Sequence, residues 1–540
     1  MRPRVANNSP LKYNLPNSQT INNKFMTFLS SLNNKVWLDI ETHFLPPLSP
    51  RFSASWAKSL ALNCFKNAIL LPAGLFTGIV TLVHKIFTSV SWTRIKKEPI
   101  DWKTLEISEM TPGEGNPDFE YSISSSTYQD SGSVNCPNSQ WKFWESQCIK
   151  NPSNRSGKSA NLFYLYKHDP HLVVQRLLQL GVTGYRTSIE WSHIEPEQGN
   201  FNYTNLETYS NFFKLCRQQG IAIDITLHHF SEPDWFHKKG SFTHPEGPQD
   251  FGRFVTYVME NLKEAIYIRN FWTINEPAIE AFSRYIRGAF SPGLKMNFPK
   301  AAQFLLGAFK AHNVAYDIIH HHKRNAKVGF THQYLKFLST SPLFFPITRY
   351  LNAITNDATL GTLETNLFKL KIPFLCNIRE PIHLKVDQMG VQIYTRPVIG
   401  FTGSTTLWNE PMTLMPFRED PEAAYEAVTE VARVSRRAVI VTETGISTQD
   451  EVQRARYLTR VLHAIKRALR DGVPVAGVNL WTFTDQLEWD MGMKPQAFGC
   501  YSLTPQGTLS ETFRAGVQPF VDACQRWKDS LEEEEIRAFA

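Results

Sequence analysis

The chain has 540 residues, of which 42% are hydrophobic and 20% charged, and this composition is typical of a globular protein with a large core. The formal net charge of +7 is uneven: residues 1–98 hold 12 Lys and Arg against 3 Asp and Glu, which leaves 45 against 47 for the rest. Because the body of the chain is nearly neutral, the composition argues against a nucleic-acid-binding protein.

The seven cysteines are scattered along the chain without a CxxC pair. This pattern favours a reducing compartment and argues against a disulfide framework or a zinc site. The first 25 residues are polar and rich in Asn, with no apolar core of a secretory leader. We therefore expect no cleavable signal peptide and a location on the cytoplasmic side.

Residues 1–110 form a basic N-terminal extension with an uncharged hydrophobic segment at 67–83, and Lys and Arg stand on both sides of that segment. A membrane-spanning helix needs about 20 apolar residues, so this segment is at the short limit, and Pro72 and Gly74 interrupt it. Two interpretations stay open: membrane contact through 60–97, where basic flanks attract anionic lipid, or a helix packed on the main domain.

From about residue 115, short β-branched and apolar runs alternate with longer amphipathic stretches. The runs are DFEYSIS (118–124), GYRTSIEW (184–191), IAIDITL (221–227), NFWTINE (270–276), AKVGFTH (326–332), VDQMGVQIY (386–394), AVIVTET (438–444) and VAGVNLWTF (475–483). Eight strands alternating with helices predict a single (β/α)8 TIM barrel, of class α/β, over 111–525. An open, doubly wound sheet is the alternative, but no GxGxxG follows the first strand.

Two further segments flank or interrupt the predicted barrel. The gap between the fifth and sixth runs, 333–385, is long and contains several prolines, so we expect an elaborated loop beside the active face. The last residues, 526–540, include four consecutive glutamates and are expected to form a solvated acidic tail.

In a barrel, residues at the carboxyl ends of the strands converge on one face, where the chemistry takes place. The predicted strand ends bring amides, an imidazole, carboxylates and a tryptophan to this face. They are Gln129, Arg186, His229, Asn275, Glu276, Tyr394, Glu443 and Trp481. Such a rim suits a sugar, because hydroxyls need polar partners and the C–H face of the ring stacks on an indole.

Glu276 and Glu443 end the fourth and seventh runs, which lie across the barrel mouth from each other. Two carboxylates facing one bond suit glycoside cleavage, in which one is a proton donor and the other attacks or activates water. Arg186 would favour the ionised form of Glu443, Tyr394 could hydrogen-bond it, and Asn275 could hold a sugar hydroxyl. The alternative is that these are two solvated glutamates at strand ends.

These motifs resemble the family 1 glycoside hydrolases, the β-glucosidase and β-galactosidase family, over about residues 115–515. The family's Thr-Phe-Asn-Glu-Pro appears as TINEP at 273–277, and its Thr-Glu-Asn-Gly as TETG at 442–445. The resemblance implies that Glu276 is the acid/base and Glu443 the nucleophile of a retaining mechanism, that Arg186 and Tyr394 attend the nucleophile, and that Asn275 contacts the 2-hydroxyl.

The resemblance also implies a set of sugar-binding positions. Gln129 and His229 would hold sugar hydroxyls, and Trp481 would form the platform under the ring. Glu488 and Trp489, in DQLEW, match the family's Asn-Phe-Glu-Trp, whose Glu holds O4 and O6. A carboxylate at this position argues against a 6-phosphosugar. The resemblance implies no cofactor and no metal.

Three departures from the family pattern stand close to the predicted nucleophile or ring site. The usual Asn-Tyr-Tyr of the sixth strand is Gln392-Ile393-Tyr394, the Asn after the nucleophile is Thr444, and Arg-Phe-Gly begins with Ala497. They suggest an unusual substrate or altered support of the nucleophile. The run at 320–322 consists of three histidines and resembles a metal tract, but it is better explained as a solvated helix end.

Three functions are therefore considered. The first is hydrolysis of a small β-glucoside or β-galactoside, and the second is membrane-associated hydrolysis or transglycosylation of a lipid-linked β-glycoside. The third is a catalytically silent sugar-binding module on the same barrel. Retention of both glutamates in the sequence favours an enzyme over the silent module.

Overall fold

The structure is a computed structural model that describes residues 101–339, 344–400, 403–405, 410–489, 491, 493 and 495–539. Most of the predicted N-terminal extension, 1–110, lies outside these residues, as do its hydrophobic segment at 67–83 and the predicted membrane contact at 60–97. Among the helices that the structure describes, none is both long enough and apolar enough to cross a bilayer.

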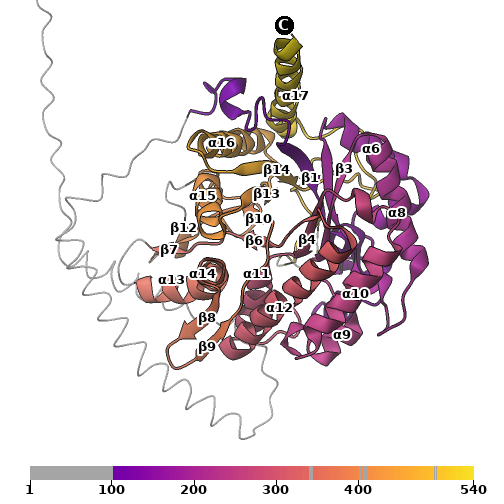
Figure 1. Cartoon of the computed structure of the whole chain (residues 1–540), viewed down its shortest axis with the longest axis vertical. Helices are drawn as coiled ribbons and strands as arrows, with labels where there is room; N and C mark the ends of the chain where they lie inside the picture. The colour runs from indigo at the N-terminus through magenta and orange to yellow at the C-terminus, as the bar shows by residue number, and fades with distance from the viewer. Residues whose placement is uncertain are drawn as a thin grey trace, which may run out of the picture. The chain divides into compact units, whose positions relative to one another are not determined.

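The centre of the fold is a ring of parallel strands in the order β5-β4-β3-β2-β1-β14-β13-β10-β6 (Figure 1). The strands are β1 (Glu120–Ser124), β2 (Gly184–Ser188), β3 (Ala222–His228), β4 (Asn270–Ile274), β5 (Lys327–Gly329), β6 (Thr331–Gln333), β10 (Gln388–Ile393), β13 (Ala438–Thr444) and β14 (Val475–Trp481). The fifth predicted run breaks at Phe330, so that β5 pairs with β4 and β6 with β10. All eight predicted runs and the single (β/α)8 barrel are confirmed.

The strands are buried on both faces, as parallel strands in a barrel must be. Every residue of β1, β2, β4 and β10 is buried. The outer faces pack against helices (Figure 1). These are chiefly α5 (Leu162–His168), α6 (Pro170–Gln179), α8 (Tyr203–Gln218), α10 (Gly247–Asn261), α12 (Phe298–His322), α15 (Ala423–Ser435), α16 (Glu451–Arg470) and α17 (Gln518–Phe539).

Local signals in the sequence set several helix ends. The Asp169 side chain accepts a hydrogen bond from the backbone N–H of Leu172 at the start of α6, and Pro170 follows at the first helical position. Asp450 caps α16 in the same way, and Gly472 lies just beyond its end with a φ of 81°. Caps of this kind satisfy backbone groups that a helix terminus leaves unpaired.

The segment between β6 and β10 is folded rather than a loop. It contains β7 (Leu338–Ser339), α13 (Phe345–Asn352), a π-helical turn (Ala353–Asp357), α14 (Ala358–Thr365), β8 (Leu367–Ile372) and β9 (Cys376–Pro381). β7 pairs with β11 (Val398–Gly400), and His332 Nε2 lies 2.8 Å from Asn356 Oδ1. The segment therefore begins beside the carboxyl ends of β6 and β10, as expected.

The C-terminal residues continue a helix instead of starting a separate tail at 526. α17 begins at Gln518 and runs to Phe539, and its first half buries Phe520 and Trp527 against the core. The glutamates at 532–535 are exposed on the last turns of this helix, which agrees with the prediction that they are solvated.

The remaining helices and turns are short and lie mostly in the loops. They are 3₁₀ turns at Ile107–Met110, Pro152–Asn154, Ser241–Thr243, Ala265–Tyr267 and Ala515–Val517, a π-helical turn at Ser283–Arg287, the helices α3 (Thr127–Asn135), α4 (Gln140–Cys148), α7 (Trp191–Ile194), α9 (Asp234–Lys239) and α11 (Pro277–Phe282), and the strands β12 (Gly403–Thr405), β15 (Gln486–Leu487) and β16 (Pro495–Gln496).

Candidate active site

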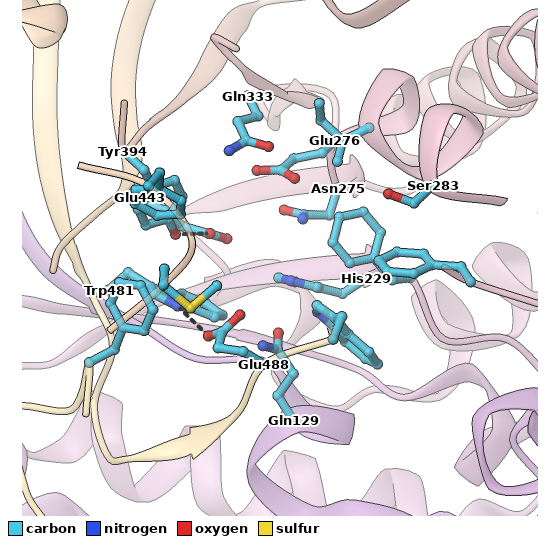
Figure 2. A pocket seen from close by; sticks show the side chains of 17 residues that line it. Gln129, His229, Asn275, Glu276, Ser283, Gln333, Tyr394, Glu443, Trp481 and Glu488 are labelled. Atoms are coloured by element: carbon cyan, nitrogen blue, oxygen red, sulfur yellow. Dashed lines mark hydrogen bonds between the residues drawn. The ribbon is translucent and has the colours of Figure 1, made fainter. Parts of the chain in front are cut away.

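A pocket opens at the carboxyl ends of the strands, and Figure 2 shows Glu276 and Glu443 directed into it from opposite walls. Nearly all sequence-predicted site residues line this pocket. They are Gln129, His229, Asn275, Glu276, Tyr394, Glu443, Trp481, Glu488 and Trp489. Arg186 is the exception, because it lies fully buried beneath the pocket and acts on it through Glu443 and Asn275.

Glu443, on β13, is held by three donors, which come from β2, from β10 and from the residue that follows β10. Its Oε1 accepts hydrogen bonds from Arg186 Nη1 at 2.6 Å and Gln392 Nε2 at 2.7 Å, and its Oε2 accepts one from the Tyr394 hydroxyl at 2.7 Å. Burial raises the pKa of Glu443, while the Arg186 charge and the hydrogen bonds from Arg186 and Tyr394 oppose the rise. Three donors also fix the direction of the carboxylate.

The Asn275 side chain is oriented by contacts to its oxygen alone. Asn275 Oδ1 accepts hydrogen bonds from Arg186 Nη2 at 2.7 Å, Gln392 Nε2 at 2.7 Å and Thr331 Oγ1 at 2.9 Å. Its Nδ2 is buried without a hydrogen-bond partner among the described residues. Because an unpaired buried amide is costly, this donor is available for a hydroxyl that enters the pocket.

Glu276 occupies the turn between β4 and α11. Its backbone is left-handed, with φ 42° and ψ 55°, and Pro277 then begins the helix. The backbone N–H of Glu276 donates to Thr331 at the start of β6. A positive φ is a strained conformation for a residue other than glycine. Strain of this kind occurs often at functional sites, where it holds a side chain in the direction that the function needs.

His229 and Trp481 lie side by side in the pocket wall. Their rings are nearly parallel, with centroids 5.8 Å apart. Burial lowers the pKa of His229 well below its usual value, and the Arg186 charge adds to the effect, so the imidazole is neutral. His229 Nδ1 has no hydrogen-bond partner among the described residues. A neutral imidazole beside an indole suits an uncharged, hydroxyl-bearing ring.

Gln129 lies on α3 and not at the end of the first strand, where the sequence placed it, because β1 stops at Ser124. Its Nε2 donates to the Leu487 backbone oxygen at 2.9 Å, and its buried Oε1 has no partner among the described residues. Glu488 Oε1 accepts a hydrogen bond of 3.2 Å from Trp481 Nε1, and Trp489 stacks on Tyr128 beneath the pocket.

Several pocket residues were missed in the sequence. Gln333 ends β6, Ser283 and Ile279 lie after Glu276, and Met415 and Phe417 come from the loop before α15. A loop residue gives no periodic signal, so Met415 and Phe417 had no sequence pattern to find them. Gln333 ends a predicted strand, and that position was a signal that could have found it.

The departures from the family pattern have different places in the site. Gln392 bonds both Asn275 and Glu443, so the longer side chain serves the nucleophile directly. Thr444 points away from it, with Oγ1 3.2 Å from the Tyr457 hydroxyl. The Ala497 backbone oxygen accepts from Arg454, and the neighbouring Phe498 lines the pocket.

Three buried groups beneath the pocket could in principle hold a cation, since ligand atoms of His228, Glu232 and Glu280 lie within 4.8 Å of one another. Arg284 already supplies positive charge there, donating to Glu280 Oε1 at 2.9 Å and Glu232 Oε1 at 2.8 Å. We therefore assign the cluster to structural support. The histidines at 320–322 end α12 as expected, and His320 pairs with Asp387 at 2.8 Å.

A parallel eight-stranded barrel with two buried glutamates facing a polar, aromatic pocket defines a glycoside hydrolase. The model of the glycosyl hydrolase family 1 matches residues 114–345 and 398–518. The chain belongs to this family.

Three similar proteins illustrate the range of relatives. The chain is 28% identical over 374 residues to a chloroplastic galactolipid galactosyltransferase, SFR2, of Arabidopsis thaliana, covering 65% of this chain and 56% of that protein, so it spans just over half of that relative. It is 23% identical to a 6-phospho-beta-galactosidase of Staphylococcus haemolyticus, covering 69% of this chain and 91% of the relative. The solved beta-glycosidase from Pyrococcus horikoshii superposes with a TM-score of 0.68 at 25% identity, covering 78% and 98% of the two chains.

Proposed function

We propose that the chain is a retaining β-glycosidase in which Glu443 is the nucleophile and Glu276 the acid/base. The observation that carries the proposal is the set of three donors on Glu443, because a carboxylate fixed in direction and supported in its ionised form suits attack on an anomeric carbon. Glu276 faces the same pocket from the opposite wall (Figure 2) and is the proposed proton donor to the leaving oxygen.

The unpaired polar atoms of the pocket are the proposed contacts to the sugar. Asn275 Nδ2 would donate to the 2-hydroxyl, while Gln129 Oε1 and His229 Nδ1 would bond other hydroxyls of the ring. Trp481 would support the C–H face of the sugar. Each of these atoms pays a desolvation penalty in the free protein that a hydroxyl would remove.

The proposed sugar is an unphosphorylated glucoside or galactoside. Glu488 lines the pocket, and among the described lining residues there is no Lys or Arg to neutralise a phosphate. Two negative groups in one buried pocket would repel each other strongly. Galactoside and 6-phosphogalactoside substrates compared side by side test this point, and preference for the phosphorylated sugar would contradict it.

The test of the catalytic roles uses aryl β-glycosides with Glu443→Gln and Glu276→Gln. Glu443→Gln should lower kcat by about 10⁴-fold for every leaving group. Glu276→Gln should lower kcat/KM, which reports the first step, by about 10²–10⁴-fold for poor leaving groups and far less for dinitrophenyl, which needs no proton to leave. Glu264→Gln is the control, because Glu264 is buried and paired with Arg217 outside the pocket.

Two outcomes would contradict the proposal. Equal release by the wild type and Glu443→Gln would favour the silent sugar-binding module. Release of the α-anomer as the first product, followed by proton NMR, would show inversion and remove Glu443 from the role of nucleophile.

A second candidate function is glycosyl transfer to, or hydrolysis of, a lipid-linked β-glycoside. The relative named galactolipid galactosyltransferase motivates it, together with the apolar residues Ile279, Phe290, Met415 and Phe417 in the pocket wall. Product analysis with a galactolipid present tests it. Only free sugar as product from a soluble glycoside, and no reaction with the lipid, would exclude this candidate.

Association with the cytoplasmic side of a membrane through 60–97 is a separate proposal, supported by the basic and apolar sequence of that segment. Fractionation of cells with the full chain and with residues 1–98 deleted tests it. If both proteins remain in the soluble fraction, the segment is not an anchor.

A further inference from the structure

The segment from α13 to β9 lies outside the family match, apart from its first residue, and has an unusual surface. The family match stops at residue 345 and resumes at 398, and α13, α14, β8 and β9 lie grouped at one side of the barrel in Figure 1. No catalytic residue proposed above lies between 344 and 382. The surface of this segment therefore requires its own explanation.

The tip of the β8–β9 hairpin is apolar and exposed. Phe374 is fully exposed and Leu375 is 50% exposed. On α13, close by across a groove, Phe345 is 58% exposed and Tyr350 39%. Large apolar side chains gathered in this way on a soluble protein mark a contact surface more often than isolated ones do.

The exposed face of the same hairpin is cationic, and two of its lysines, Lys369 and Lys371, line the groove beside α13. Lys369 and Arg379 stand directly opposite each other in the antiparallel register, and Lys371 follows on the same exposed face. Like charges at opposed positions destabilise a hairpin. In the part of the chain that the structure describes, none of these three residues has a carboxylate partner within salt-bridge distance, because the nearby Glu380 and Glu364 pair with other cations.

The carboxylates of the segment do not relieve this charge. Glu364 pairs with Arg433 and Glu380 with Lys310, and both of those cations lie outside the segment. Asp357 lies in the groove between α13 and β8, where the charges of Arg349 and Lys336 act on it. The hairpin face is therefore left with an unbalanced positive charge behind an apolar tip.

We propose that this hairpin docks on a membrane surface bearing anionic lipid headgroups. The docking face consists of Lys369, Lys371, Phe374, Leu375 and Arg379. Phe374 and Leu375 enter the boundary between headgroups and acyl chains, and the three cations contact the headgroups. An apolar edge with cations set behind it is the arrangement that interfacial segments use, whereas a nucleic acid would need the cations without the exposed apolar tip.

Docking of this kind does not depend on the proposed catalytic roles, so it is measured by binding and not by activity. Because residues 60–97 are separately proposed to contact a membrane, the contact of the hairpin is measured at its own peptides. Hydrogen exchange of the full chain, followed by mass spectrometry, locates the contact. We expect peptides covering 367–381 to be protected by vesicles of phosphatidylcholine with phosphatidylglycerol, and not by vesicles of phosphatidylcholine alone. The protection should weaken as salt is added, because salt screens exposed charges.

Two variants and a matched control test the contribution of the face. Phe374→Ser/Leu375→Ser should lower the vesicle partition coefficient of the full chain by about tenfold, and Lys369→Gln/Lys371→Gln by about tenfold. The control is Ile266→Ser/Val452→Ser, which removes two exposed apolar side chains elsewhere on the barrel, Ile266 at 62% and Val452 at 64% exposure. It should leave partitioning unchanged.

The proposal is overturned if 367–381 exchanges equally with and without anionic vesicles, or if the hairpin variants partition like the control. Protection without vesicles that rises with protein concentration would assign the face to a second copy of this chain. If the Phe374→Ser/Leu375→Ser variant still hydrolyses an aryl glycoside while its partition coefficient falls, failure of docking is separated from failure of the catalytic proposal.

Discussion

Two polar clusters inside the barrel use the same residue types in different ways. The base cluster lies at the amino ends of the strands and consists of Glu120, Asp224, Arg269, Asn270 and Gln388. Asn270 Nδ2 donates to Glu120 and Asp224 at 3.0 Å each, and Asn270 Oδ1 accepts from Gln388 at 2.8 Å. None of these five residues has a buried side-chain nitrogen or oxygen without a partner.

The nucleophile cluster lies at the carboxyl ends and consists of Arg186, Asn275, Gln392, Tyr394 and Glu443. It is just as dense, but Asn275 Nδ2 and Gln392 Oε1 are buried without partners in the described part of the chain. A fully satisfied network stabilises a fold, whereas a network with unpaired groups beside a cavity is prepared for a ligand. The comparison therefore separates structural from functional polar groups within one barrel.

The largest effect should distinguish the two arginines. Arg186→Lys removes the fork that bonds Glu443 and Asn275 together, so kcat should fall by about 10²-fold with little change in stability. Arg269→Lys removes the bidentate bond to Asp224 and should lower the free energy of unfolding by about 1–3 kcal/mol with kcat unchanged. Aryl-glycoside kinetics and urea unfolding measure both, and the same pattern for the two variants would break the comparison.

Substitutions of Gln392 and Gln388 should also affect activity and stability, respectively, with smaller effects than those of the two arginines. Gln392→Asn shortens the donor that reaches both Asn275 and Glu443, and kcat should fall by about tenfold. Gln388→Asn weakens a single bond to Asn270 and should cost about 1 kcal/mol of stability. Wild-type kcat in Gln392→Asn would mean that the longer side chain does not support the nucleophile.

The pH profile tests the support that Tyr394 gives to Glu443. The hydrogen bond from Tyr394 lowers the pKa of Glu443 against the effect of burial, so Tyr394→Phe should raise that pKa. The acid limb of kcat/KM, which reports ionisation of the nucleophile in the free enzyme, should then move to higher pH. An acid limb that stays in place, or moves to lower pH, would contradict this role.

The last prediction concerns the pH dependence of stability at the base cluster. Burial raises the pKa of Glu120 from 4.5 to about 7 despite the charge of Arg269. A raised pKa favours the protonated carboxyl in the folded state, so its contribution is fully present below pH 4.5 and is lost as the pH rises through about 7. The free energy of unfolding of the wild type should fall relative to that of Glu120→Gln across this range, and parallel curves would contradict the shift.

Much of this architecture was predictable from periodicity and motifs. All eight strand runs were located, because buried parallel strands read as short apolar runs between amphipathic helices. The predicted strand-end residues other than the buried Arg186 line one pocket, because the carboxyl ends of barrel strands converge. The strand ends and motifs therefore predict both Glu276 and Glu443. The three hydrogen-bond donors that hold the Glu443 carboxylate are seen only in the structure.

The remaining features depend on three-dimensional details that no local pattern encodes. The register of β10 and β13 shifts between Val391 and Gln392, which places Gln392 opposite Glu443, and a bulge of this kind re-aims side chains without a clear sequence signal. The sequence predicts Gln129 at a strand end, but the chain turns from β1 into α3 before this residue, and no local pattern marks that turn. The prolines of the segment at 344–382 favour a loop, so the sequence did not predict its helices and strands.

The central claim is that Glu443 attacks the sugar, and trapping the covalent intermediate tests it most directly. A 2-deoxy-2-fluoro-β-glycoside with a dinitrophenyl leaving group slows both steps at the positively charged transition state, while the good leaving group keeps the first step accessible. We predict a glycosyl adduct on the peptide carrying Glu443, found by mass spectrometry, and its absence in Glu443→Gln. Turnover without an adduct, or an adduct on another residue, would contradict the account.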